Sequence, residues 1–172
     1  MRNKKILLLF FLLFSSLSSK NNYELGGDLL QGIFPAASMG LTVLNKDPDG
    51  RKMFYKGSVL TIASTYLLKI SINKKRPNGG GWSFPSGHTS WAFSNAAFIH
   101  KRCGHKLGIP AFILASFVGW SRVESRNHYW NDVVWGAVLG TVCSYFSTSN
   151  FTLNSTSDVS TNQLFINFSM KL

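Results

Sequence analysis

Five apolar segments separated by polar breaks constrain this chain more than any other feature of its sequence. They occupy residues 29–44, 57–72, 86–99, 108–120 and 133–147, and none alternates between apolar and polar residues as a half-buried strand does. Stretches rich in glycine, proline or charge separate them, near residues 46–50, 77–81, 101–106 and 122–131. We therefore expect an all-helical bundle, and 172 residues supply the core of one domain.

The two ends of the chain differ from this middle part. Residues 1–19 run from charged, through an apolar stretch at 6–14, to a serine-rich stretch, which is the order of a secretory signal peptide. An uncleaved first membrane helix has the same order, so we expect residues 1–20 to be one or the other and residues 21–148 to form the helical domain. Residues 149–172 read as a polar tail, although their end, from Leu164 to Leu172, alternates with the period of a strand.

The net charge of +11 is distributed unevenly along the chain. If each apolar segment crosses a membrane once from a cytoplasmic N-terminus, most bases fall inside, as the positive-inside rule requires. About six membrane helices would then form, counting the first. A soluble helical bundle outside the cytoplasm is the alternative, because the segments are short and contain serine, threonine and asparagine. Nucleic acid is not an expected partner, since zinc-finger spacing and a single basic stripe are missing from the sequence.

The first stretch whose residues could take part in catalysis or binding runs from Lys69 to Pro77. On a helix a spacing of seven is nearly two turns, so Lys69 and Arg76 are predicted to share one face, and Pro77 to end the helix. Bases that extend from a helix end towards solvent are the ordinary alternative.

The second stretch is Phe84-Pro-Ser-Gly-His-Thr89, directly before an apolar segment. Ser86 is predicted to cap the helix, Gly87 to let backbone amides approach a ligand, and His88 to add a titratable donor beside the helix N-terminus, which attracts anions. A plain helix cap with a surface histidine is the alternative.

The third stretch contains Arg122, His128 and Asp132. Residues four apart meet on one helix face, and an aspartate that holds one imidazole nitrogen leaves the other free as a base or nucleophile. Arg122 offers a planar, permanently charged fork for phosphate oxygens. The ordinary alternative is a histidine–aspartate pair that caps a helix start.

Taken together, the three stretches suit phosphoryl transfer, in which positioning and charge stabilisation supply most of the catalysis. The chain has only seven acids, and they are scattered, while its histidines and cysteines lack zinc-ligand spacing. We therefore expect no metal and no cofactor.

At these residues the sequence resembles the type 2 phosphatidic acid phosphatase and haloperoxidase superfamily. The family pattern is Lys-x6-Arg-Pro, then Pro-Ser-Gly-His, then Ser-Arg-x5-His-x3-Asp, and every element is intact between Lys69 and Asp132. The resemblance implies a helical bundle, often with six membrane helices and an extracytoplasmic site. It also implies the following roles: phosphate binding by Lys69, Arg76, Ser86, Gly87 and Arg122; nucleophilic attack by His128; orientation of His128 by Asp132; proton transfer by His88.

The expected function is thus a metal-independent phosphatase that acts on membrane lipids, of the phosphatidate, prenyl diphosphate or lipid A type, through a phosphohistidine. Its expected location is a bacterial inner membrane with a periplasmic active site. Three alternatives stay open: a soluble periplasmic acid phosphatase of the same superfamily that acts on small phosphomonoesters, a vanadate haloperoxidase, and a non-catalytic lipid-binding membrane protein.

Overall fold

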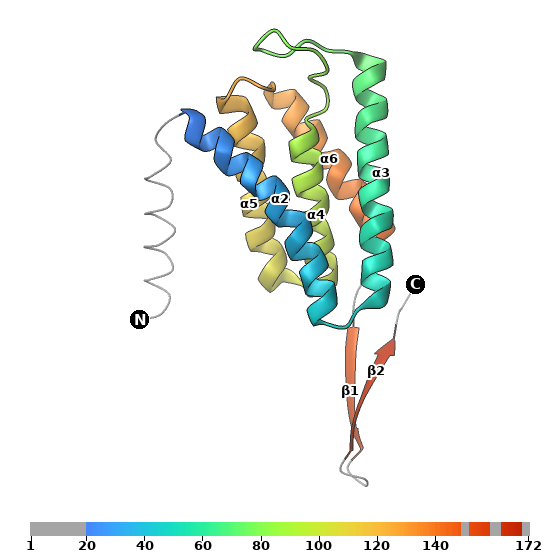
Figure 1. Cartoon of the computed structure of the whole chain (residues 1–172). Helices are drawn as coiled ribbons and strands as arrows, with labels where there is room; N and C mark the ends of the chain where they lie inside the picture. The colour runs from blue at the N-terminus through green and yellow to red at the C-terminus, as the bar shows by residue number, and fades with distance from the viewer. Residues whose placement is uncertain (1–19, 149–151, 159–162, 170–172) are drawn as a thin grey trace, which may run out of the picture.

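The expected helical bundle is present. The computed structural model describes residues 20–148, 152–158 and 163–169, so the apolar stretch at 6–14 lies outside the described residues. All five predicted segments are helices, and each helix extends beyond its apolar segment at one end or both. They are α2 (Lys20–Leu44), α3 (Pro48–Ile72), α4 (Gly87–Cys103), α5 (His105–Glu124) and α6 (Trp130–Ser147) (Figure 1).

Helix α4 is the central element and packs against each of the other four helices. Its buried face carries the small side chains of Ala92, Ala96 and Ala97, which let neighbouring backbones approach. Glycines do the same on α6, because a Cβ at Gly136 would lie only 2.8 Å from the carbonyl oxygen of Ser86. The start of α4, where the phosphate-binding residues are expected, is therefore fixed against α6.

The interior of the bundle contains many polar side chains, including Ser38, Thr61, Thr65, Ser94 and Asn95. Hydroxyl groups bridge helices α3 and α4: Thr61 donates to Ser94 at 3.0 Å, and Thr65 and Ser90 share a hydrogen bond of 2.9 Å. These bonds satisfy groups that would otherwise be costly to bury.

The exterior of the bundle carries many large apolar side chains. They include Leu25, Leu29 and Ile33 on α2, Val59, Leu67 and Ile70 on α3, Leu107, Ile109 and Ile113 on α5, and Val134, Val138 and Phe146 on α6.

About six membrane helices were expected from the sequence. Within the part of the chain that the structure describes, no helix has both the length and the apolar character needed to cross a membrane.

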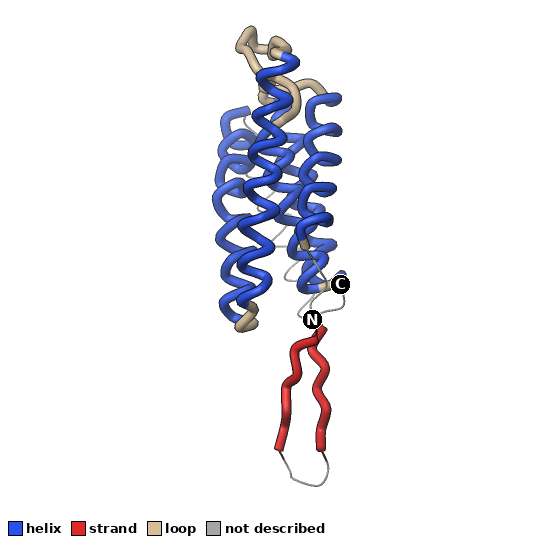
Figure 2. Tube along the Cα trace, turned by 90° about the vertical axis from the view of Figure 1, so that its right-hand side faces the viewer, coloured by secondary structure: helices blue, strands red, loops and turns tan. Residues whose placement is uncertain are grey.

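The C-terminal region is more regular than a simple polar tail. Strands β1 (Thr152–Asp158) and β2 (Gln163–Ser169) pair antiparallel, with Thr152 opposite Ser169. The hairpin extends beyond the bundle at the end opposite the loops that join α3 to α4 and α5 to α6 (Figures 1 and 2). The first part of the alternating sequence, from Leu164 to Phe168, falls in β2, and its last part lies outside the described residues.

Candidate active site

Two loops meet at one end of the bundle and carry much of the candidate site. One connects α3 to α4 and the other connects α5 to α6 (Figure 1). The amide of Asn78 in the first loop donates to Asn127 Oδ1 in the second at 2.9 Å. The second loop is anchored to α5, since the backbone N–H groups of Asn127 and His128 both donate to the carbonyl oxygen of Arg122. Residues far apart in sequence are thereby held beside one another.

The predicted helical face shared by Lys69 and Arg76 is wrong. Helix α3 ends at Ile72, because Asn73 adopts the left-handed conformation with φ of 41° and its N–H closes the last turn on the carbonyl of Lys69. Arg76 therefore lies in the loop after the helix, and Pro77 is not what ends it. Lys69 and Arg76 nevertheless line the same cavity.

His128 and Asp132 do not lie on one helix, which was the condition for their meeting on one helix face, although the two side chains do meet. Helix α6 begins at Trp130, so His128 lies in the loop before it and Asp132 in its first turn. His128 Nδ1 is 3.8 Å from Asp132 Oδ2, an ion-pair distance that is too long for a hydrogen bond.

One cavity of about 400 Å³ collects most of the predicted site residues. Its lining includes Lys69, Arg76, Gly87, His88 and His128. The remaining lining residues belong to α2, α3 and α4: Gln31, Thr61, Ile62, Thr65, Tyr66, Ser90 and Trp91.

His128 is held in its neutral form. Its side chain is 3% exposed. Burial, together with the nearby charges of Lys69 and Arg76, lowers its pKa to about 3 against the smaller opposing effect of Asp132. At neutral pH the imidazole keeps a free lone pair, which a nucleophile needs.

The Lys69 ammonium loses its proton more readily than an exposed lysine does. Its Nζ donates to the carbonyl oxygen of Trp82 at 2.8 Å. Burial and the charge of Arg76 lower the pKa of Lys69 to about 8, while Asp132 opposes the shift. A bound phosphate would oppose the same shift and favour the ammonium form.

Asp132 is fully buried and fully engaged. Lys74 Nζ lies 2.7 Å from Oδ1, while Ser83 Oγ and the backbone N–H of Tyr129 both donate to Oδ2. Burial alone would raise the pKa of Asp132, but these donors outweigh it and lower the pKa below its ordinary value. His128 therefore faces a carboxylate that stays ionised and is fixed in orientation.

The predicted helix cap at Ser86 is confirmed. Ser86 is the N-cap of α4, and its Oγ accepts the hydroxyl of Thr89 at 2.9 Å and the backbone N–H of Thr89 at 3.4 Å. Gly87 begins the helix, beside the cavity. The N-terminal end of α4, with its partial positive charge, thus lies at the cavity that His88 and His128 line.

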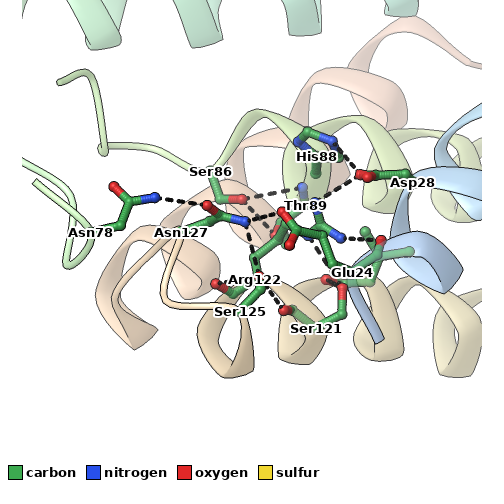
Figure 3. Close-up of polar contacts among 11 residues, drawn as sticks. Glu24, Asp28, Asn78, Ser86, His88, Thr89, Ser121, Arg122, Ser125 and Asn127 are labelled. Atoms are coloured by element: carbon green, nitrogen blue, oxygen red, sulfur yellow. Dashed lines mark hydrogen bonds and ion pairs between the residues drawn. The ribbon is translucent and has the colours of Figure 1, made fainter. Parts of the chain in front are cut away.

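Arg122 is at the site but does not line the cavity. Its side chain is 3% exposed, and Nη1 donates to Asp28 Oδ1 at 2.8 Å while Nη2 donates to the carbonyl oxygen of Glu24 at 2.7 Å. The guanidinium is therefore held by the first half of α2 (Figure 3).

His88 contacts the same carboxylate as Arg122. Its Nε2 lies 3.1 Å from Asp28 Oδ1. Burial and the charge of Arg122 lower the pKa of His88, and Asp28 partly offsets them. In the absence of substrate, His88 therefore needs a pH below its usual range before it carries a proton.

Sequence reasoning missed Asp28, Lys74 and Ser83. Asp28 carried a weak signal, as one of only seven acids and located beside an apolar segment. Lys74 appeared to be one base of a cluster, and nothing local separates Ser83 from other serines. Their partners lie 94, 58 and 49 positions away, so only the fold brings them to the site.

No metal centre is visible among the described residues, since no group of three or more histidine, cysteine, aspartate or glutamate side chains could hold an ion there.

Comparison with known proteins identifies the family. The model of the PAP2 superfamily matches residues 59–155, more than half of the chain, so the chain belongs to the PAP2 superfamily. This confirms the resemblance seen in the three motifs. The chain is also 36% identical over 137 residues to a lipid A 4′-phosphatase from Helicobacter pylori strain J99, which covers 73% of this chain and 69% of that protein.

Other relatives match over shorter regions. A lipid A 1-phosphatase from Porphyromonas gingivalis is 37% identical over 76 residues, and lipid phosphate phosphatase 1 from Arabidopsis thaliana is 40% identical over 86 residues. Each match covers 42% of this chain but only 17% and 26% of those longer proteins, respectively. The crystal structure of LpxE from Aquifex aeolicus shares the fold, with a TM-score of 0.57, 22% identity and coverage of 70% of this chain and 84% of that one.

Proposed function

We propose that this protein is a metal-independent phosphatase that hydrolyses a phosphomonoester or diphosphate group of a membrane lipid through a phosphohistidine at His128. The observation that carries the proposal is the neutral, buried imidazole of His128 at the wall of a cavity that also holds Lys69, Arg76 and His88. A neutral nucleophile surrounded by fixed positive charge is the arrangement that phosphoryl transfer needs.

In the first step the lone pair of His128 attacks phosphorus and the bond from phosphorus to the lipid oxygen breaks. Because Nδ1 faces Asp132, Nε2 is the nitrogen assigned to the attack. The departing oxygen takes a proton from His88. Lys69, Arg76 and the N-terminal end of α4 stabilise the charge on the transferred group, and Arg122 joins them when it turns from Asp28.

In the second step water attacks the phosphohistidine, the phosphorus–nitrogen bond breaks, and His88 accepts a proton from the water. Orthophosphate leaves and His128 regains its lone pair. The positive side chains meet the need for charge neutralisation that a metal ion meets in other phosphatases. Asp132 steadies the imidazole of His128 throughout, as the aspartate of a catalytic triad does.

Two observations support a lipid substrate at a membrane. The relatives named above are lipid A and lipid phosphate phosphatases. Large apolar side chains are also exposed on α2, α3, α5 and α6, and exposed apolar surface of this kind marks contact with a membrane or a partner. We propose that this exterior contacts lipid and that the active site faces away from the cytoplasm.

The proposed function is tested by phosphate release in the presence of excess chelator. The substrates are lipid A, phosphatidate, a prenyl diphosphate, phosphatidylglycerol phosphate and a small water-soluble phosphomonoester. We expect release from at least one lipid, faster than from the soluble ester, and none from a folded His128→Ala variant. A magnesium requirement, or no release from any of the five substrates, would contradict the proposal. Preference for the soluble ester would instead favour an acid phosphatase.

The proposed orientation has its own test in intact cells. In a variant that lacks Cys103 and Cys143, a cysteine at Gly80 should react with an impermeant thiol reagent, and a cysteine at Asp49 should not. Labelling at position 49 alone would place the site on the cytoplasmic side.

A further inference from the structure

The first half of α2 holds two of the groups that the proposed reaction needs. Asp28 Oδ1 accepts from Arg122 Nη1 at 2.8 Å and lies 3.1 Å from His88 Nε2, so both donors converge on one oxygen atom (Figure 3). A phosphate oxygen in the position of this carboxylate oxygen would have the same two donors, one cationic and one protonatable.

Each of the three nitrogens of the Arg122 guanidinium has a hydrogen-bond partner, and the partners of Nη1 and Nη2 lie on α2. Nη2 donates to the carbonyl oxygen of Glu24 at 2.7 Å and Nε to Ser121 Oγ at 3.2 Å. The helix approaches closely because Gly27 has no side chain: a Cβ there would collide with Arg122 and Ser121. Arg122 is therefore buried with all three of its nitrogens engaged, and a phosphate oxygen that takes the place of Asp28 must displace the bond from Nη1.

The acid that must give way is suited to move. The Asp28 side chain is 49% exposed, whereas that of Arg122 is 3% exposed. A carboxylate at the protein surface can rotate into water and recover hydration, so its displacement costs much less than exposing a buried charge without a partner.

We propose that Asp28 is an internal anion that occupies a phosphate-oxygen position between Arg122 and His88 and competes there with substrate and with product phosphate. The proposal rests on the proposed function, because it assigns Arg122 and His88 to phosphate. This competition lowers the affinity of the site for phosphate. Binding that is equally strong for substrate and product adds nothing to turnover, whereas weaker product binding speeds release.

A different role for Asp28 predicts the opposite behaviour. If Asp28 oriented His88 or Arg122 for catalysis, as Asp132 faces His128, its loss would lower kcat and leave phosphate affinity the same or weaker. If it competes with phosphate, its loss raises phosphate affinity and lowers both KM and the inhibition constant of orthophosphate.

The test is calorimetric titration of purified protein with orthophosphate, compared between the wild type and Asp28→Asn. Glu24→Gln is the matched control, because it removes one negative charge from the same helix one turn away. The Glu24 carboxylate contacts Asn127 rather than Arg122 or His88. We expect phosphate to bind Asp28→Asn about 5- to 20-fold more tightly, as the loss of one charge-assisted competitor implies, and Glu24→Gln less than about twofold more tightly.

The outcomes separate the two proposals. Unchanged or weaker phosphate binding by Asp28→Asn, in a protein whose wild type binds phosphate, overturns the role of Asp28 and leaves the proposed function intact. An equal gain in Glu24→Gln also overturns it, because the effect would then be one of net charge. Failure of the wild type and both variants to bind phosphate overturns both proposals. If Asp28→Asn does not fold, Asp28→Ala is subject to the same criteria.

Discussion

Two histidine–aspartate pairs lie at the candidate site, and they are built differently. In the pair of His128 and Asp132 both side chains are buried, and the carboxylate is fixed by Lys74 and two further donors. In the pair of His88 and Asp28 the histidine is one-third exposed and the carboxylate half exposed, and the carboxylate is shared with Arg122. The same two residue types thus form a fixed pair at His128 and Asp132, and at His88 and Asp28 a pair whose carboxylate can be replaced by another anion. Burial and the number of donors decide which role the aspartate has.

The same substitution in both aspartates should have the largest and most unequal effect. Asp132→Asn is expected to lower kcat about 10,000-fold, because a neutral amide does not stabilise the imidazolium of phosphohistidine and, with one acceptor oxygen instead of two, cannot keep its bonds to both Lys74 and Ser83. Asp28→Asn should change kcat by less than about tenfold. Steady-state kinetics on folded variants provide the measurement. Equal losses in the two variants would show that the pairs act alike.

The two histidines should also fail in different ways. His88→Ala is expected to lose about 100- to 10,000-fold in rate with a lipid substrate, which is the usual contribution of a general acid and base. With a substrate whose leaving group needs no proton, the first step should recover much of that loss, whereas His128→Ala should recover nothing. Single-turnover kinetics with both substrates distinguish the two. No recovery in His88→Ala would remove His88 from the role of acid.

Arg122 shares the Asp28 carboxylate with His88, so a change in the shape of its side chain alone should be costly. Arg122→Lys keeps the charge but cannot hold both Glu24 and, in place of Asp28, a phosphate oxygen with one fork. We expect a loss of about 100- to 1000-fold in kcat/KM, comparable with the loss of one donor to a transition state. Near-normal turnover in a folded variant would mean that Arg122 serves only to hold α2.

The smallest expected effect is a dependence on pH that separates the cations from the nucleophile. Because the pKa of Lys69 is lowered to about 8, the ammonium that binds phosphate is lost as the pH rises through 8. Above pH 8 the value of kcat/KM should then fall by up to about a further tenfold per pH unit, in addition to the effect of the loss of the His88 proton, which occurs at lower pH. Lys69→Arg should move this decline to higher pH. Since the pKa of His128 is about 3, its protonation should not limit activity at any pH near neutrality. A decline below pH 6.5 that follows protonation of His128 would contradict the electrostatic account.

The sequence predicted the helices better than it predicted the positions of the site residues relative to them. Long apolar segments and the cap at Ser86 are local signals, and each of the five helices in the described part of the chain was predicted. Spacing rules failed where a residue was assumed to lie on a helix. Asn73 ends α3 before Arg76, and α6 starts after His128, so both residues reach the cavity from loops. The motifs nevertheless identified residues that meet at the site, because a loop can bring the same side chains together.

The remaining part of the site depended on contacts that no local pattern contains. Asp28 meets Arg122 from 94 positions away, and Lys74 meets Asp132 from 58 positions away. Each is an ordinary charged residue in its own segment. What distinguishes them is the packing of α2 against α5 and the path of the loop between α3 and α4.

The central claim is that His128 forms a covalent bond to phosphorus, and trapping of the phosphoenzyme tests it most directly. Protein is mixed with labelled substrate, quenched within milliseconds and held in alkali, in which phosphohistidine survives and acyl phosphate does not. The account predicts label on the peptide that contains His128 in the wild type, and no label in His128→Ala. In His88→Ala, with a leaving group that needs no proton, it predicts accumulation of label because water activation is impaired. A phosphoenzyme that still forms in His128→Ala would contradict the account.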